Sequence, residues 1–585
     1  MKYPVHVIAA CLMSAGFLVF TATAEEIDPA ADCMATASVD EITLSPDIPC
    51  DFAGDGTYGP KDGTQLARFA WNTFIAMNWP ADDPFFPPYE RGAASKDASF
   101  GKAGAPVVWD TWREKRELFT IRQTAPGVYN MIEPPAFNDG SPPQTTGPNP
   151  QIAACPQVTH PAKGFVTTLQ NNKVENYLDE TDEIGLAVLW RNDTTYPTED
   201  SIIRYQVKFD ENHYSYVRDN GFWDPSVLSG AINSEISSGN GVGVVLPQGD
   251  NETAQMGSIL VKTGWMKLDE EEVSEGKYYA QTAIFYNDTG DGGVCYDYGE
   301  YGLIGMHIIR STKSFPYFFF STFEHKENYP NVFTYGNTNG AANPGQASPY
   351  SSTLPNPFGV DYKNPTDPAP NQTDKTSPGY PATRLVAETD SITAANAEAA
   401  SLLTGTFWEN YRLVGVQYMP TDKPGDTPGN YFADGAPATV ADPAGKGYAP
   451  NYYPDQEYYL ANPVVETSQR FQFFEGGFSE AAKKNIISYL NNDPHASLPD
   501  GDPTPTASID MGGCMGCHGN TQETHFSFTL SGAIQQDSQT GLYEPATISG
   551  YSADALDTVC AELSLELSAS ATACIEPATV GGAKE

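Results

Sequence analysis

Two cysteines and a histidine near the C-terminus have the types and the spacing that attach a haem covalently. Cys514 and Cys517 lie three positions apart, and His518 follows directly. Two thiols at this spacing reach the two vinyl groups of one porphyrin as thioethers, and the adjacent histidine then falls under the iron as proximal ligand. The sequence therefore predicts one covalent haem c, with Cys514 and Cys517 as cofactor-binding residues and His518 as an iron ligand.

Other uses of a paired-cysteine motif fit this segment less well. A thioredoxin-like dithiol belongs in a βαβ setting, and a zinc half-site needs a second pair of ligands at suitable spacing, which does not follow here. The segment instead contains several glycines, which favour a loop: Gly512, Gly513, Gly516 and Gly519. Haem attachment is the interpretation that these residues favour.

The other ligand of the iron is harder to assign, because no methionine follows Met515. We rank His325 first as distal ligand, since it follows an aromatic strand at an expected loop edge, and Met419 second. The remaining candidates are His307, Met306, His213, His160, His495 and the downstream His525. A five-coordinate or water-ligated iron is the alternative, and it would leave an open site for chemistry.

Six further cysteines remain once the motif and Cys11 of the N-terminal segment are set aside. In an oxidising compartment they can form up to three disulfides. Proximity in the sequence favours Cys33–Cys50 and Cys560–Cys574, which leaves Cys155–Cys295 as a long-range pair. Six cysteines allow 15 pairings, so the connectivity is an expectation only.

The N-terminus predicts export. Lys2 precedes an apolar run from Val7 to Phe20, and Ala22-Thr23-Ala24 gives the small-x-small pattern of a cleavage site. About 14 apolar residues are too few to span a bilayer comfortably, so residues 1–24 are expected to be a removable signal peptide. The mature protein is then periplasmic or secreted, with no integral membrane segment.

Charge narrows the classes of partner. The chain of 585 residues carries 74 Asp and Glu against 32 Lys and Arg, a net charge of −42. Without Lys2 the mature balance is 31 against 74, or −43. Such a field repels phosphate backbones, so nucleic acid is not expected as a partner, whereas a redox protein with a basic docking patch is.

The elements that must position these residues are predicted to be mainly strands. β-branched and aromatic runs bounded by turn residues recur between residues 184 and 323, and a further run follows at Leu413–Met419. The runs in the first region are Gly185–Arg191, Ile202–Phe209, Ser258–Leu268, Tyr278–Tyr286, Tyr301–Arg310 and Phe315–Phe323. Helices are expected at Thr64–Asn78, Val108–Leu118, Ile392–Leu403 and, after Ser479, up to Leu490. We therefore expect an α+β protein with a mainly antiparallel sandwich or barrel-like core, flanking helices and a C-terminal helical haem segment.

The expected division of the chain follows from this pattern. Residues 1–24 form the signal peptide, residues 25–475 a large β-rich domain with peripheral helices and long loops, and residues 476–585 the haem-binding segment. Residues 120–180 and 329–382 are rich in loop-forming residues.

Several motifs together resemble one family. The haem motif lies in residues 512–520, with Phe526-Ser527-Phe528 soon after, and the runs 71–80, 305–308, 322–325, 408–415 and 460–462 precede it. The set resembles a family of large bacterial exported monohaem c-type cytochromes, with a single C-terminal motif behind a β-rich region. The resemblance implies the roles already given to Cys514, Cys517 and His518, and it implies no substrate.

Three functions are consistent with these features. The first is a cytochrome that passes single electrons between redox partners. The second is a haem enzyme, peroxidase-like or oxygenase-like, whose β-rich region binds a substrate over an open iron, since a simple carrier needs only about 100 residues. The third is an interaction module that docks the haem onto a dehydrogenase. Catalytic residues are not assigned by any of the three.

Overall fold

The computed structural model describes residues 33–35, 39–52, 61–82, 87, 89–125, 128–131, 133–143, 152–158, 167–168, 204–238, 244–288, 294–316, 318–327 and 389–418. Near the C-terminus it describes residues 524, 527–531, 533–537, 540 and 542–545. Of the helices expected from the sequence, the one after Ser479 lies outside these residues, as does the expected strand at Gly185–Arg191.

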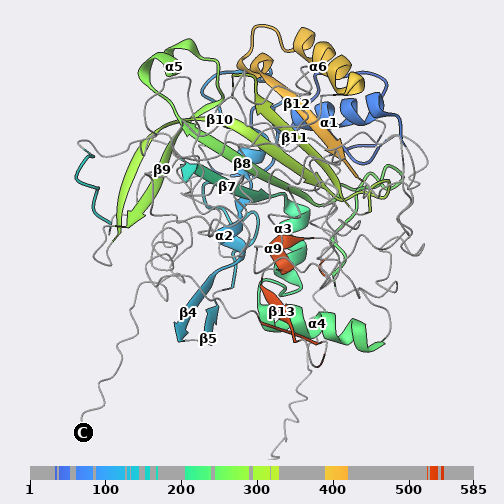
Figure 1. Ribbon diagram of the computed structural model, residues 1–585, viewed down its shortest axis with the longest axis vertical. Helices are drawn as coiled ribbons and strands as arrows, with labels where there is room; N and C mark the ends of the chain where they lie inside the picture. The colour runs from blue at the N-terminus through green and yellow to red at the C-terminus, as the bar shows by residue number, and fades with distance from the viewer. Residues whose placement is uncertain are drawn as a thin grey trace, which may run out of the picture.

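One eight-stranded sheet organises the described chain (Figure 1). Its main order is β12-β11-β10-β8-β7-β3, and β9 pairs with β10 and with β6. All pairings are antiparallel except β6 with β9. Its strands are β3 (Arg113–Glu114), β6 (Thr167–Thr168), β7 (Arg204–Phe209), β8 (Ile259–Lys267), β9 (Ala280–Asp288), β10 (Val294–Arg310), β11 (Phe319–His325) and β12 (Tyr411–Gln417).

The α+β class with a mostly antiparallel sheet is confirmed, but the expected closure is wrong. The sheet is open, with β12 at one end of its main path and β3 at the other. Within the described residues the other sheets have only two strands each, so no second large layer forms a sandwich. They comprise β1 (Cys33–Met34) with β2 (Ile48–Pro49), β4 (Ile121–Ala125) with β5 (Val128–Met131), and β13 (Ile534–Gln536) with β14 (Tyr543–Pro545).

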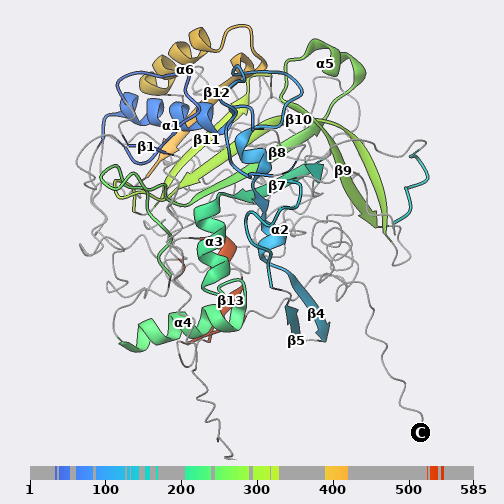
Figure 2. The same cartoon turned by 180° about the vertical axis from the view of Figure 1, so that it is seen from behind.

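Helices take the place of a second sheet. In both views, α1 (Gly63–Met77) and α6 (Asp390–Leu402) lie together beside β11 and β12, whereas α3 (Glu211–Asp219), α4 (Pro225–Ser238) and β13 lie away from them (Figures 1 and 2). The shorter elements are α2 (Lys115–Leu118), α5 (Glu270–Glu275), α9 (Phe528–Ser531) and the 3₁₀ turns η1 (Val108–Thr111) and η4 (Phe407–Asn410). Among the residues described, no helix is both long enough and apolar enough to cross a bilayer.

Helix α1 matches the expected helix at Thr64–Asn78 within a residue or two. The Asp62 carboxylate caps its start by accepting hydrogen bonds from the backbone amides of Thr64 at 2.9 Å and Gln65 at 3.0 Å. The apolar face packs onto the sheet through aromatic rings. Phe74 stacks on Phe323 with ring centroids 4.3 Å apart, and Phe69 meets Phe319 edge to face at 5.1 Å.

The two faces of β10 carry different residues. Met306 and Arg310 face α1: Asn78 lies 3.9 Å from the Met306 sulfur, and the Arg310 guanidinium donates to the Thr73 hydroxyl at 2.7 Å. Because side chains alternate along a strand, His307 and Ile309 lie on the opposite face. We call this the α3 face, since α3 packs against it.

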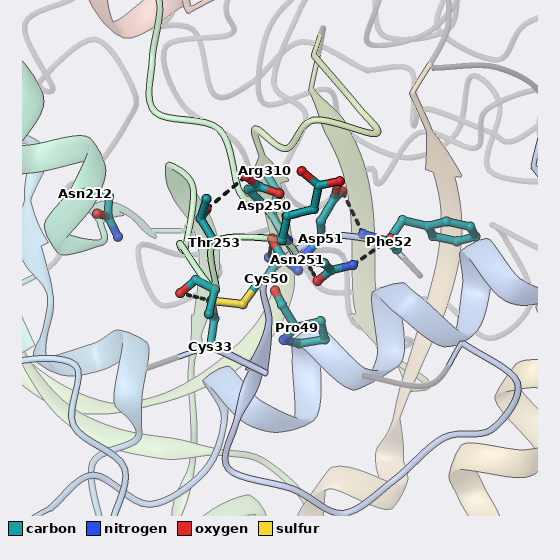
Figure 3. Close-up of a disulfide and its surroundings, with 12 residues drawn as sticks. Cys33, Pro49, Cys50, Asp51, Phe52, Asn212, Asp250, Asn251, Thr253 and Arg310 are labelled. Atoms are coloured by element: carbon teal, nitrogen blue, oxygen red, sulfur yellow. Dashed lines mark hydrogen bonds between the residues drawn. A yellow bond between two sulfur atoms is a disulfide. The ribbon is translucent and has the colours of Figure 1, made fainter. Parts of the chain in front are cut away.

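Two predicted disulfides are confirmed. The N-terminal disulfide, Cys33–Cys50, joins β1 to the end of β2, and the long-range disulfide, Cys155–Cys295, spans 140 residues to reach β10. Around the N-terminal disulfide, the Asn251 amide accepts a hydrogen bond from the Asp51 backbone and donates one to the Phe52 carbonyl (Figure 3). Cys560 and Cys574 lie outside the described residues.

Several local predictions need correction. The expected helix at Val108–Leu118 is broken into η1, β3 and α2, because Arg113–Glu114 pairs with β7 as a strand. The expected loop after residue 120 contains the β4–β5 hairpin. Strand β10 begins at Val294 rather than Tyr301, since its first half pairs with β9.

Candidate functional site

The described C-terminal residues pack into the core of the large unit. Leu530 is fully buried, Ala533 and Ile534 are nearly so, and all three belong to the cluster that contains the buried residues of the sheet. Farther on, the Asn233 side chain of α4 makes two hydrogen bonds of 2.7 Å with the backbone of Tyr543. The chain that follows the haem motif is thus held on the same core as residues 204–238.

The start of this C-terminal segment is also buried. Thr524 is 0% exposed and donates from its hydroxyl to the Ser527 carbonyl at 3.1 Å. The Ser527 and Thr529 hydroxyls lie 2.7 Å apart, and both residues are buried. These bonds keep the polar side chains of the segment satisfied where it meets the sheet.

A small cavity lies where the C-terminal segment meets the α3 face of the sheet. It has room for about one water-sized sphere. Residues from five parts of the chain line it: His213 of α3, Ser258, Leu260 and Lys262 at β8, Ile309 of β10, Phe318 before β11, and Ser527 and Thr529 at α9. This is our candidate site, and its lining residue nearest to His518 along the chain is Ser527, nine positions later.

The strand register explains why the polar residues of the cavity lie on one face. Leu260 pairs with Ile309, and Lys262 pairs with His307 one step farther along the same two strands. Directly opposite residues of an antiparallel pair project to the same side of the sheet. Lys262 and His307 are therefore cross-strand neighbours on the α3 face.

His213 is held in a defined orientation. Its ring stacks on Phe209 with centroids 4.4 Å apart and an interplanar angle of 13°, and only 1% of the residue is exposed. Its backbone amide donates to the Asp210 carboxylate at 3.1 Å, and the same carboxylate accepts from the Ile259 amide at 2.7 Å. Burial raises the pKa of Asp210 to about 7, although these amide hydrogen bonds act in the opposite direction.

The cavity is also bordered by an unusual backbone. Phe318 has φ 76°, in the left-handed region that bulky residues rarely adopt. Nearby, the Ser258 hydroxyl is buried and has no hydrogen-bond partner among the described residues. Strained backbone and unsatisfied polar groups are enriched at functional sites, so both features make this cavity a candidate site.

The ranked ligand candidate His325 lies elsewhere, at the end of β11. Its ring stacks on Tyr278 at 3.9 Å, its Nε2 lies 3.3 Å from the Lys277 carbonyl oxygen, and its Nδ1 accepts from the Glu327 amide at 3.2 Å. Burial lowers its pKa to about 3, so the ring is neutral at physiological pH. Both ring nitrogens are therefore engaged with local backbone, and iron ligation by His325 would require one of these contacts to break.

The other predicted site residues divide into two groups. Cys514, Cys517, His518 and Met419 lie outside the described residues, as do His160, His495 and His525. Met306 is buried beneath α1, and His307 is buried on the α3 face. The four described cysteines are paired with one another and therefore not with Cys514 or Cys517.

Sequence reasoning did not single out Lys262, Phe318 or Thr529, and it noted Ser527 only within the run Phe526-Ser527-Phe528. None has a local signature, because the chain brings them together only through the register of β8 with β10 and the packing of α9. The described part of the chain contains no group of three or more His, Cys, Asp or Glu side chains arranged to hold a metal ion. Family models, curated proteins and solved structures were all compared with this chain, and none matches.

Proposed function

We propose that the protein is an exported monohaem c-type cytochrome that carries single electrons between redox partners. The observation that carries the proposal is the Cys514-Met515-Gly516-Cys517-His518 sequence. The donor set fits the group: two thiols for the vinyl groups of one porphyrin and one imidazole for its iron. The two disulfides of the described chain support an oxidising compartment, which is where such a protein would work.

A haem bound there would supply one-electron chemistry at a potential that the surrounding protein sets. Cys514 and Cys517 would hold the ring and His518 would ligate the iron. Thr524 lies six positions after His518, so their Cα atoms can lie at most about 20 Å apart. Because Thr524 is anchored in the core, we infer that the haem is tethered to the body of the protein beside α9, as the expected C-terminal haem segment requires.

The charge of the chain indicates the kind of partner. At −43 for the mature protein, the surface attracts a redox protein with a basic docking patch. One exposed contribution is α5, whose first turn holds Glu270, Glu271 and Glu272. Steering of this kind weakens as salt is added, since charges beyond a Debye length of about 10 Å at 0.1 M are screened.

The alternative is a haem enzyme with an open distal site. The observation that favours it is the size of the core: one eight-stranded sheet with helices is far more than a small carrier needs. The two functions differ in the distal coordination of the iron. An internal ligand favours electron transfer, and an exchangeable position favours catalysis on a substrate.

The test is an absorption spectrum of the full-length protein matured in a host that attaches haem c. Covalent haem is expected in the wild type and absent from the matched variant with Cys514→Ser and Cys517→Ser. A reduced spectrum that carbon monoxide leaves unchanged supports an electron carrier, and a clear shift favours the enzyme. If the wild type carries no covalent haem, both functions are refuted.

A further inference from the structure

We propose that the cavity on the α3 face binds one water molecule, which joins the sheet to the C-terminal segment. The water bridges the hydroxyl of Ser258, just before β8, to the paired hydroxyls of Ser527 and Thr529. This inference goes beyond the proposed function, because all three residues belong to the described chain and none of them is assigned to the haem.

The size of the cavity selects its ligand. The cavity has room for about one water-sized sphere, so it accepts a single water and excludes a larger molecule. Its walls come from segments far apart in the sequence, with Leu260 and Ile309 on the sheet and Ser527 and Thr529 on the C-terminal segment. A ligand bound there therefore contacts both parts of the protein.

Ser258 supplies the first reason for a polar ligand. The residue is 2% exposed, and its hydroxyl has no hydrogen-bond partner among the described residues. Because side chains alternate along a strand, Ser258 projects to the same face as Leu260 and Lys262, which also line the cavity. A buried hydroxyl without a partner costs free energy, and one bound water offsets that cost.

The C-terminal segment supplies the second partner. Ser527 and Thr529 are both buried, and their hydroxyl oxygens lie 2.7 Å apart. In such a pair one hydroxyl donates to the other, and the accepting hydroxyl keeps its own O–H for a third group. A water can accept that O–H and donate one of its own hydrogens to Ser258, which gives it two partners. Two hydroxyl positions suffice, so no atom of His213 or Lys262 has to be unengaged.

The apolar part of the wall favours the opposite state, a dry cavity. Leu260, Ile309 and Phe318 line the same space, and a purely apolar cavity stays dry. The two states differ in what the Ser258 hydroxyl contributes to stability. In a dry cavity its removal relieves a desolvated polar group, whereas beside a bound water its removal breaks a hydrogen bond. The sign of the effect therefore separates them.

Ser311 provides the matched control. It lies beside Ser258, since its backbone amide donates to the Ser258 carbonyl at 3.0 Å, and its hydroxyl is also buried without a partner among the described residues. Ser311 is not one of the residues that line the cavity. Ser258→Ala and Ser311→Ala therefore remove the same group from similar surroundings, once at the cavity and once away from it.

The measurements are thermal unfolding of the full-length variants and hydrogen exchange of the amides in α9. In Ser258→Ala the melting temperature should fall, and exchange in α9 should become about fivefold faster, the factor expected for the loss of one hydrogen bond. Ser311→Ala should cause neither change. The proposal is overturned if Ser258→Ala is at least as stable as the wild type, or if α9 exchanges equally fast in the two variants.

A crystal structure of the full-length protein identifies the occupant of the cavity. We expect one water within hydrogen-bond distance of Ser258 Oγ and of the hydroxyl of Ser527 or Thr529. A dry cavity, a bound ion or a side chain that fills the space would each refute the water site. This result also decides the question if Ser258→Ala does not fold.

Discussion

Leu530 offers a direct test of whether the C-terminal segment shares one cooperative core with the sheet. It is fully buried, and Leu530→Ala removes three carbon atoms from the cluster that also contains the buried residues of α1 and β10. Such a deletion costs about 2–5 kcal/mol of the free energy of unfolding. For a cooperative unit of about 300 residues, each kcal/mol moves the melting temperature by about 1.5 °C, so we expect a decrease of about 3–8 °C.

The assay follows unfolding by far-ultraviolet circular dichroism, which reports the sheet, and by the Soret band, which reports the haem. Both transitions should move together in Leu530→Ala. Leu542→Ala is the matched control from the same segment, because Leu542 is 43% exposed and its truncation should cost less than about 0.5 kcal/mol. A Leu530→Ala variant whose Soret transition moves while the far-ultraviolet transition stays in place would refute the shared core and make residues 476–585 a separate unit.

The remaining predictions concern the disulfides and a buried ion pair. Replacing both cysteines of the long-range disulfide with serine should destabilise the protein by about 2 kcal/mol more than the same change at the N-terminal disulfide, because the closed loops span 140 and 17 residues. Urea unfolding of the two variants measures this difference. Equal losses of stability would contradict the prediction. Glu117→Gln should lower the free energy of unfolding by about 3–5 kcal/mol, since it leaves the fully buried Arg113 guanidinium without its main counter-charge. The control is Glu133→Gln, at an exposed ion pair with Arg218, which should lower it by less than about 1 kcal/mol. Burial acts to raise the pKa of Glu117, but the charges of Arg113 and Arg91 and the hydrogen bonds from Arg113 and the Glu114 amide together outweigh it, and the pKa is lowered. The stability that the Glu117 carboxylate contributes is therefore complete above its unfolded pKa of about 4.3 and is lost as the pH falls through the lower folded pKa. The difference in free energy of unfolding between wild type and Glu117→Gln should then shrink in acid. A difference that does not change with pH would contradict this role of Glu117.

The strands and long helices were predictable because their signals are local. Asp62, an N-cap residue followed by apolar residues at helical spacing, predicts α1. The β-branched and aromatic residues of Ile259–Lys267 predict β8. Strand β10 was predicted too short, because its first half contains Tyr, Asp, Gly and Glu without alternation and is a strand only through pairing with β9. Closure of the sheet depends on which strands end up at its edges, and no local pattern carries that information.

Helix α3 shows why the candidate site could be predicted only in part. Its residues are mostly polar, so apolar periodicity does not reveal it, although Asp210 ahead of Asn212 and His213 is a recognisable N-cap signal. The Cys514–His518 motif consists of five consecutive residues, so it can be recognised from the sequence without knowledge of the fold. The cavity, in contrast, exists only because α9 packs against strands that lie more than 200 residues earlier in the chain.

The anchoring of the C-terminal segment also bears on the choice between electron carrier and enzyme. A haem on a long flexible tether could deliver electrons at a distance from the body, and the large sheet would then have no part in its chemistry. Under the proposed function, the Cα of His518 lies within about 20 Å of that of the buried Thr524, so a haem on His518 would stay close to the body of the protein. A large core beside the haem would then serve an electron carrier as well as an enzyme, so size alone does not decide between the two. What separates the two is whether a side chain of the protein fills the distal position of the iron.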